Sequence, residues 1–167
     1  MKNIFLSIIL LSSILCQSQI IDIPDINFKN KLVNTNCVDS NNDGTYDADV
    51  DTNNDGKIQE SEALAISGSL NVSNSGIANL KGIEAFTNLT KLNCNSNDFS
   101  SLDVTKNINL IELRCGFTNK LSTLDITKNI NLTLLHCFSN ALTNVDLSQN
   151  INLKELSLGY NPITNID

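Results

Sequence analysis

The fold is decided by a repeat that begins at Leu89, where residues 89–109 read LTKLNCNSNDFSSLDVTKNIN. Residues 110–131 read LIELRCGFTNKLSTLDITKNIN, residues 132–152 read LTLLHCFSNALTNVDLSQNIN, and residues 153–167 start another copy with LKELSLGYNPITNID. The period is 21, 22 and 21 residues, and the shared template is L-x-x-L-x-C-x-x-N-x-L-x-x-L-D. A period of this length is typical of a solenoid in which each copy forms one coil.

The first half of each copy predicts a short strand, because apolar residues recur at every second position. Stacked copies of such a strand form a parallel sheet whose neighbours lie about 4.8 Å apart. The positions expected to face inward are Leu92, Leu113, Leu135 and Leu156, together with Cys94, Cys115, Cys137 and Leu158.

Asparagines mark two bends in each copy, since this side chain tolerates a tight turn and can bond the backbone groups that the turn leaves unpaired. The second half of each copy is expected to return as extended or 3₁₀ structure (102–104, 124–126, 145–147). The first bend is predicted at Asn97, Asn119, Asn140 and Asn161, and the second at Asn107, Asn129 and Asn150.

These copies resemble the leucine-rich repeats of secreted bacterial surface proteins. The segment before them, GIANLKGIEAFTNLTKL (76–92), resembles the first repeat of internalin-like proteins and has apolar residues spaced by three. The resemblance covers about residues 23–167. It implies an α/β-type leucine-rich repeat solenoid with right-handed coils, a concave parallel sheet and a short helical N-terminal cap. It also implies that the chain continues into more repeats and a C-terminal sorting domain.

The N-terminal sequence predicts that the protein is exported. Lys2 precedes an apolar run from Ile4 to Leu15, and small residues follow, which is the pattern of a signal peptide cleaved after Ser18. The run is too short to span a membrane. A short N-terminal anchor and lipidation of Cys16 remain alternatives. Apart from lipidation or an N-terminal anchor, association with a membrane would require a further C-terminal region. We therefore expect a secreted or cell-surface protein.

Four regions follow from these patterns: a signal peptide (1–18), a helical cap (19–66), an atypical first repeat (67–88) and the regular repeats (89–167). The formal net charge is -7 without basic runs, which argues against a nucleic-acid partner.

The equivalent positions of Cys94, Cys115 and Cys137 predict a ladder of buried thiols. A disulfide between adjacent rungs is the alternative. Zinc binding by His136 and Cys137 is disfavoured, because successive strand residues point to opposite faces.

A calcium loop is predicted ahead of the repeats, where residues 39–63 read DSNNDGTYDADVDTNNDGKIQESEA. The second half matches the EF-hand pattern D-x-[DN]-x-[DN]-G-x5-E. Oxygen ligands at these places suit a hard cation, and a glycine at the sixth place permits the sharp turn. The expected ligands are the side chains of Asp51, Asn53 and Asp55, the carbonyl of Lys57, and both oxygens of Glu62.

A weaker second calcium site is predicted twelve residues earlier, with Val50 where the closing glutamate would stand. Its expected ligands are Asp39, Asn41, Asp43, Thr45 and Asp47. Helices are expected at 25–33, with Pro24 in the first turn, and at 60–66. Together with the loops they would cover the apolar end of the first coil, as a solenoid requires. The alternative is that calcium bridges the protein and a ligand.

The exposed sheet positions form three predicted rows. They are Lys91, Glu112, Leu134 and Glu155; Asn93, Arg114, His136 and Ser157; and Asn95, Gly116, Phe138 and Gly159. An exposed apolar and aromatic patch is expected around Phe138, and such patches often mark interaction sites. The predicted partner-binding residues are Arg114, Phe117, Leu134, His136, Phe138 and Tyr160.

The predicted function is recognition of an extracellular protein or a glycan through the concave face. A structural or assembly module of a larger surface protein is the alternative. An enzyme is not expected, because His136 is the only histidine and no nucleophile motif, phosphate loop or paired carboxylates lie outside the acidic segment.

Overall fold

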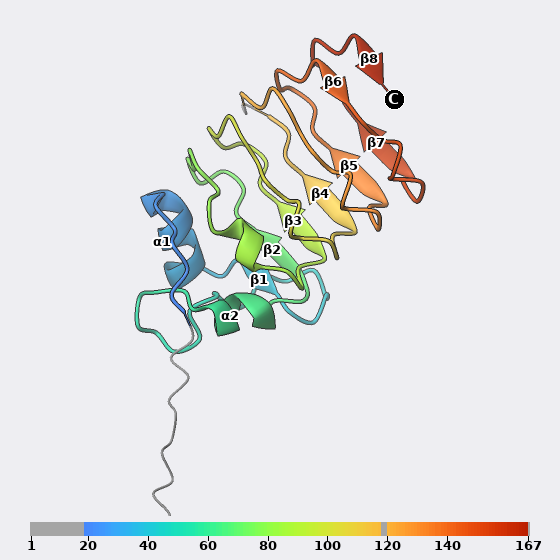
Figure 1. Cartoon of the computed structure of the whole chain (residues 1–167). Coiled ribbons are helices and arrows are strands. Elements are labelled where there is room, and N and C mark those ends of the chain that lie inside the picture. The colour runs from blue at the N-terminus through green and yellow to red at the C-terminus, as the bar shows by residue number, and fades with distance from the viewer. Residues whose placement is uncertain (1–18, 118–119, 167) are drawn as a thin grey trace, which may run out of the picture.

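The computed structural model describes residues 19–117 and 120–166, and its coils stack in a row away from the N-terminal helices (Figure 1). The predicted signal peptide and Asn119 lie outside the described residues. The elements are α1 (Ile26–Asn34), β1 (Val38–Asp39), α2 (Glu60–Ala65), β2 (Ser69–Asn71), the 3₁₀ turn η1 (Ile83–Ala85), β3 (Lys91–Asn93), β4 (Glu112–Arg114), β5 (Leu134–His136), β6 (Asn144–Val145), β7 (Glu155–Ser157) and β8 (Asn165–Ile166).

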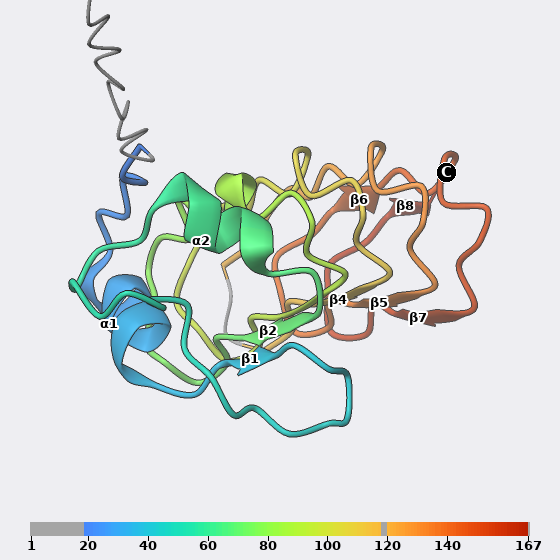
Figure 2. The ribbon, with the colours of Figure 1, turned by 90° about the horizontal axis from the view of Figure 1, so that it is seen from below.

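One sheet follows the stack in the order β1-β2-β3-β4-β5-β7. Strand β1 is antiparallel to β2, and every later pair is parallel. Leu92 pairs with Leu113, Leu113 with Leu135, and Leu135 with Leu156, so the register is the one that the repeat predicts. Strands β6 and β8 pair on the other side of the coils, as Figure 2 shows.

The core consists of the inward residues of each coil, stacked on their counterparts in the next. Leu92, Leu113 and Leu135 are almost fully buried. Leu156 occupies the same position in the last described coil but is 42% exposed, because no described coil packs on its far side. Burial along the core therefore depends on having a neighbouring coil on each side.

Buried asparagines join each coil to the one before it. The Nδ2 group of Asn129 donates to the carbonyls of Val104 (3.0 Å) and Asn107 (2.9 Å), and Asn107 and Asn150 make equivalent pairs of bonds. The first-bend residue Asn97 donates to Val72 of the preceding coil and to Cys94 of its own coil. The predicted bends are confirmed at the described asparagines, and the bonds between coils are an addition from the structure.

The N-terminal cap is attached to the first coil through Asp25. Its Oδ1 accepts the amides of Asn27 and Phe28 at the start of α1, and its Oδ2 accepts the amides of Ala78 and Asn79. The helix thus starts at Ile26 with Asp25 as its N-cap, and Pro24 precedes the cap rather than lying in the first turn. That detail of the sequence prediction was wrong, because the capping carboxylate decides where the helix begins.

The return segments contain little regular structure. In the described residues the only 3₁₀ turn is η1, in the atypical first repeat, so the expected 3₁₀ alternative for the later coils is not found. Both α-helices of the described chain are too short to cross a membrane, and no membrane-spanning candidate occurs there.

Candidate functional site

The exposed face of the sheet carries the side chains that the repeat register predicts. Lys91, Glu112, Leu134 and Glu155 form one row along the strands, and Asn93, Arg114, His136 and Ser157 form the next. Most of these side chains are half-buried rather than fully exposed. The structure therefore brings the predicted residues together, in a surface more closely packed than the sequence suggested.

Polar contacts connect the rows across four coils. The carboxylate of Glu112 lies 3.4 Å from Lys91 Nζ and 3.1 Å from Arg114 Nη2. Arg114 Nη1 lies 3.4 Å from His136 Nδ1, and His136 Nε2 lies 2.6 Å from Glu155 Oε1. Each contact is partly exposed, so its contribution to stability is small. The main consequence is that these side chains are held in a defined arrangement on the concave face.

Phe138 packs over a glycine in the preceding coil. A Cβ atom at Gly116 would lie 3.0 Å from the Phe138 carbonyl oxygen and 3.1 Å from its ring, so a larger residue there would require the ring or the backbone to shift by a few tenths of an ångström. The Phe117 ring meets the Phe138 ring edge-on, with centroids 4.4 Å apart and an interplanar angle of 78°. The apolar patch expected around Phe138 is therefore half-buried, since its ring is covered by Phe117 and the Gly116 backbone.

Two aromatic residues at this edge occupy a strained backbone conformation. Phe117 and Tyr160 have φ values of 60° and 57°, while the equivalent positions in other coils carry Asn74, Ser96 and Ser139. The left-handed region is tolerated by asparagine and glycine and is costly for bulky residues. Phe117 is 48% and Tyr160 is 89% exposed. Phe117 packs on Phe138 of the next coil, whereas Tyr160 lies in the last described coil and has no described coil beside it. Backbone strain of this kind is often found at functional sites.

Replacing Tyr160 with asparagine is expected to stabilise the protein by about 1 kcal/mol, because asparagine relieves the left-handed strain and little packing is lost. The measurement is urea unfolding of the variant beside the wild type. Ser139→Tyr, which places the same ring on the equivalent backbone position, is the matched control and should destabilise by a similar amount. A loss of stability in Tyr160→Asn would contradict the strain argument.

The two acidic loops share one backbone shape. In the second loop the Gly56 amide donates to Asp51 Oδ2 (2.7 Å), and in the first the Gly44 amide donates to Asp39 Oδ2 (3.1 Å). Equivalent bonds also run from the Asp55 amide to Asn53 Oδ1 and from the Asp43 amide to Asn41 Oδ1, and the equivalent left-handed residues are Asn54 and Asn42. The sequence similarity of the loops therefore corresponds to a similarity in structure.

The loops differ at the place that would close a calcium site. Val50 is completely buried in the core and supplies no ligand to the first loop. Glu62 closes the second loop, but its carboxylate accepts the Thr52 hydroxyl and the amides of Asn53 and Gln59. With Gln59 it forms a capping box at the start of α2. This role of Glu62 was not predicted, although glutamate three residues after glutamine is a sequence signal for a capping box.

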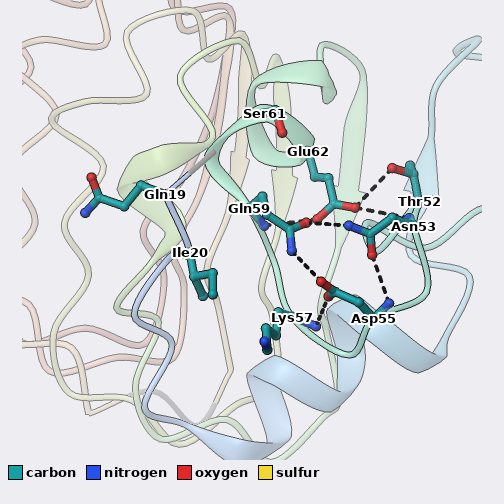
Figure 3. Close-up of a pocket in the computed structure, with 9 residues that line it drawn as sticks. All are labelled: Gln19, Ile20, Thr52, Asn53, Asp55, Lys57, Gln59, Ser61 and Glu62. Carbon is teal, nitrogen blue, oxygen red and sulfur yellow. Dashed lines mark hydrogen bonds between the residues drawn. The ribbon is translucent and has the colours of Figure 1, made fainter. Parts of the chain in front are cut away.

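Figure 3 shows the open pocket of about 760 Å³ beside this loop. Asp55, Gln59 and Glu62 line it, together with Gln19 and Ile20 of the N-terminal segment. Within residues 19–117 and 120–166, no three or more His, Cys, Asp or Glu side chains are gathered closely enough to hold a metal ion. The carboxylates of Asp55 and Glu62 instead accept hydrogen bonds within the loop and from the start of α2.

The four cysteines of the described chain are thiols without disulfides, as the ladder prediction requires. Cys94 Sγ lies 3.3 Å from the Arg114 carbonyl oxygen. A hydrogen bond with the Cys137 side chain and burial raise the pKa of the Cys115 thiol well above its usual value. Burial raises the pKa of Cys94 and raises that of Cys37 to about 12. The raised pKa values keep Cys37, Cys94 and Cys115 protonated in the native protein near neutral pH.

Stability is expected to fall above pH 9, with a contribution from Cys94 of about 1.4 kcal/mol per pH unit. An unfolded thiol releases its proton near pH 8.5 while native Cys94 keeps its own, so rising pH favours the unfolded state. Urea unfolding at pH 9 and 10 measures this slope, and Cys94→Ala should reduce it. Equal slopes in the two proteins would show that the native thiol ionises.

No protein-family model and no curated protein matches the chain. Among solved structures, a functional domain of InlJ from Listeria monocytogenes, described as including a cysteine ladder, has 43% identity and a TM-score of 0.63. The match covers 66% of this chain and 24% of that domain, so the chain spans about a quarter of its length. The internalin InlF from the same organism has 18% identity and a TM-score of 0.62, covering 86% of this chain and 45% of that one. The chain therefore has a leucine-rich repeat solenoid fold similar to that of the Listeria internalins.

Proposed function

We propose that the chain is a binding module that recognises an extracellular protein or a glycan through its concave face. The observation that carries the proposal is the pair of strained aromatic residues, Phe117 and Tyr160, at the edge of that face. Other coils carry serine or asparagine at this position, whereas the coils of Phe117 and Tyr160 carry an exposed aromatic ring there. Aromatic residues and arginine contribute most of the binding energy at protein interfaces.

The half-buried polar chain supports the same proposal. Arg114 and His136 are held by Glu112 and Glu155 before any partner arrives, so little side-chain freedom remains to be lost on binding. Phe138 is likewise held by Phe117. A surface ordered in advance in this way suits recognition.

The test is binding of the purified protein to intact cells and to a glycan array. Phe138→Ala and Arg114→Ala should each weaken binding by more than about 1 kcal/mol, which is more than about fivefold. Lys106→Ala and Lys128→Ala, in the return segments, are the controls and should leave binding unchanged. Loss of binding in the lysine variants, with Phe138→Ala unaffected, would move the site to another surface.

We also propose that the second acidic loop binds calcium and that the ion stabilises the N-terminal cap. The loop sequence supports this proposal, as do two carboxylates, Asp51 and Glu62, which are only 2% and 6% exposed. In the described chain neither carboxylate forms a salt bridge with a lysine or an arginine. Buried carboxylates are usually paired with a cation or coordinate a metal. The first loop lacks a closing ligand at Val50, so one ion is expected rather than two.

A further inference from the structure

A small pocket of about 200 Å³ lies where the N-terminal cap meets the concave sheet. Figure 2 shows the loop after β1 projecting past the row of sheet strands, and this loop supplies one wall. Asp39 and Tyr46 come from that side, and Lys91, Asn93 and Arg114 come from the sheet. The pocket lies at the opposite end of the concave face from Tyr160, and Arg114 is the one predicted partner-binding residue that lines it.

The lining is unusually polar for a binding pocket. Apart from Gly44 and Leu92, every lining residue carries a polar or charged side chain. The Tyr46 hydroxyl lies 3.1 Å from the Ser69 hydroxyl, so the two already form a hydrogen-bonded pair at the wall. Pockets for apolar ligands and for protein side chains are lined mostly by apolar groups. This pocket instead presents hydrogen-bond donors and acceptors side by side.

The charges in the pocket cancel. Lys91 and Arg114 both contact Glu112, and the second carboxylate is that of Asp39, which is 5% exposed. The Asp39 carboxylate accepts the amides of Asp43 and Gly44, which hold it in place. A site with two carboxylates and two cations attracts neither an anion nor a cation strongly. Its ligand is therefore expected to be neutral.

We infer that this pocket binds one neutral hexopyranose unit, such as the terminal sugar of a glycan. The lining of the pocket mixes amide, hydroxyl, carboxylate and ammonium groups, so it offers both donors and acceptors. A sugar hydroxyl can pair with either kind, because it both donates and accepts hydrogen bonds. The volume is below the range of about 300–1,000 Å³ that larger ligands occupy, so it suits a single ring. Tyr46 adds an aromatic side chain at the wall. The inference rests on the concave face being the binding surface, and it narrows the partner to a glycan at this end.

The experiment titrates the secreted protein with monosaccharides, observed by NMR and by calorimetry. Galactose, mannose, glucose, N-acetylglucosamine and N-acetylgalactosamine are the neutral probes, and glucuronate and N-acetylneuraminate are the charged ones. At least one neutral sugar is expected to bind in the millimolar range, as a single-ring ligand allows. Binding by none of the neutral sugars, or tighter binding by the charged ones, would overturn the inference.

Two conservative variants place the sugar in the pocket. Tyr46→Phe removes the hydroxyl and keeps the ring, and Asn93→Asp keeps the oxygen that accepts the Asn95 amide. Each should weaken sugar binding roughly three- to tenfold. Lys128→Ala, in a return segment away from the concave face, should leave it unchanged. If Tyr46→Phe lowers the melting temperature, its weaker binding could reflect a loss of folding, and the Asn93→Asp variant then decides the result. Unchanged affinity in Asn93→Asp would place the sugar elsewhere.

Failure of this inference is distinguishable from failure of the proposed function. If a partner is captured in a way that depends on Phe138 but no sugar binds, the concave face remains a binding surface and only the hexose pocket is ruled out. Sugar binding that depends on Asn93 supports the pocket whether or not Phe138→Ala affects partner capture.

Discussion

Replacing Asn129 with alanine is expected to lower the free energy of unfolding by about 3 kcal/mol. Its side chain is completely buried and donates to two carbonyls of the preceding coil, those of Val104 and Asn107. Alanine would leave both carbonyls buried without these donors, and each such loss costs about 1–3 kcal/mol. Chemical unfolding of the wild type and the variant measures the difference.

The matched control is Asn131→Ala in the same coil. Asn131 is exposed and donates once, to the Ile108 carbonyl at 3.3 Å, so its removal should cost less than about 0.5 kcal/mol. A similar small loss for Asn129 would show that bonds between coils contribute little and that the apolar core alone holds the stack together. A loss near the expected value would make the asparagines principal contributors to coil stacking.

Calcium at a hundred times its dissociation constant is expected to stabilise the protein by about 2.7 kcal/mol. The ion would bind native Asp51 and Glu62 and not the unfolded chain, so its binding free energy adds to the free energy of unfolding. Thermal unfolding in calcium and in excess chelator measures the effect. Glu62→Gln should abolish most of the difference, because it removes the charge that closes the loop while a side-chain oxygen remains to cap α2.

Asp43→Asn in the first loop is the control for this experiment. The loop has the same turn but no closing carboxylate, so its variant should retain the full response to calcium. A wild-type melting curve unchanged by chelator would rule out the calcium cap. Loss of the response in Asp43→Asn, with Glu62→Gln unaffected, would assign the ion to the first loop.

Much of the architecture could be predicted from the sequence, because in a repeat of constant length each residue lies beside its counterpart in the next coil. The template with leucine every second or third position was enough to predict the strands, the parallel register and the rows of side chains on the concave face. The bends at the asparagines and the buried thiols at Cys94, Cys115 and Cys137 followed from the same periodicity. All of these depend on local spacing alone.

The contacts between coils could not be predicted in this way. The sequence indicated that Phe138 faces outward, but only the structure shows its ring lying over Gly116 and against Phe117. Likewise it placed Arg114 and His136 in one row without indicating that each is held by a glutamate. Residues about twenty positions apart meet only through stacking, and the side-chain orientations that decide such contacts leave no trace in the repeat pattern.

The coil followed from the sequence alone, because periodic burial of leucine admits one strand register, and the two acidic loops followed from their repeated spacing of aspartate, asparagine and glycine. The tertiary structure decided which of these features form a surface. It buried Val50, the residue at the closing place of the first loop, in the core. It also placed Asp39 and Tyr46 of that loop against Lys91 and Arg114 of the sheet. Segments about fifty residues apart came together there because the cap must cover the apolar end of the first coil, a requirement that arises only when the chain is packed in three dimensions.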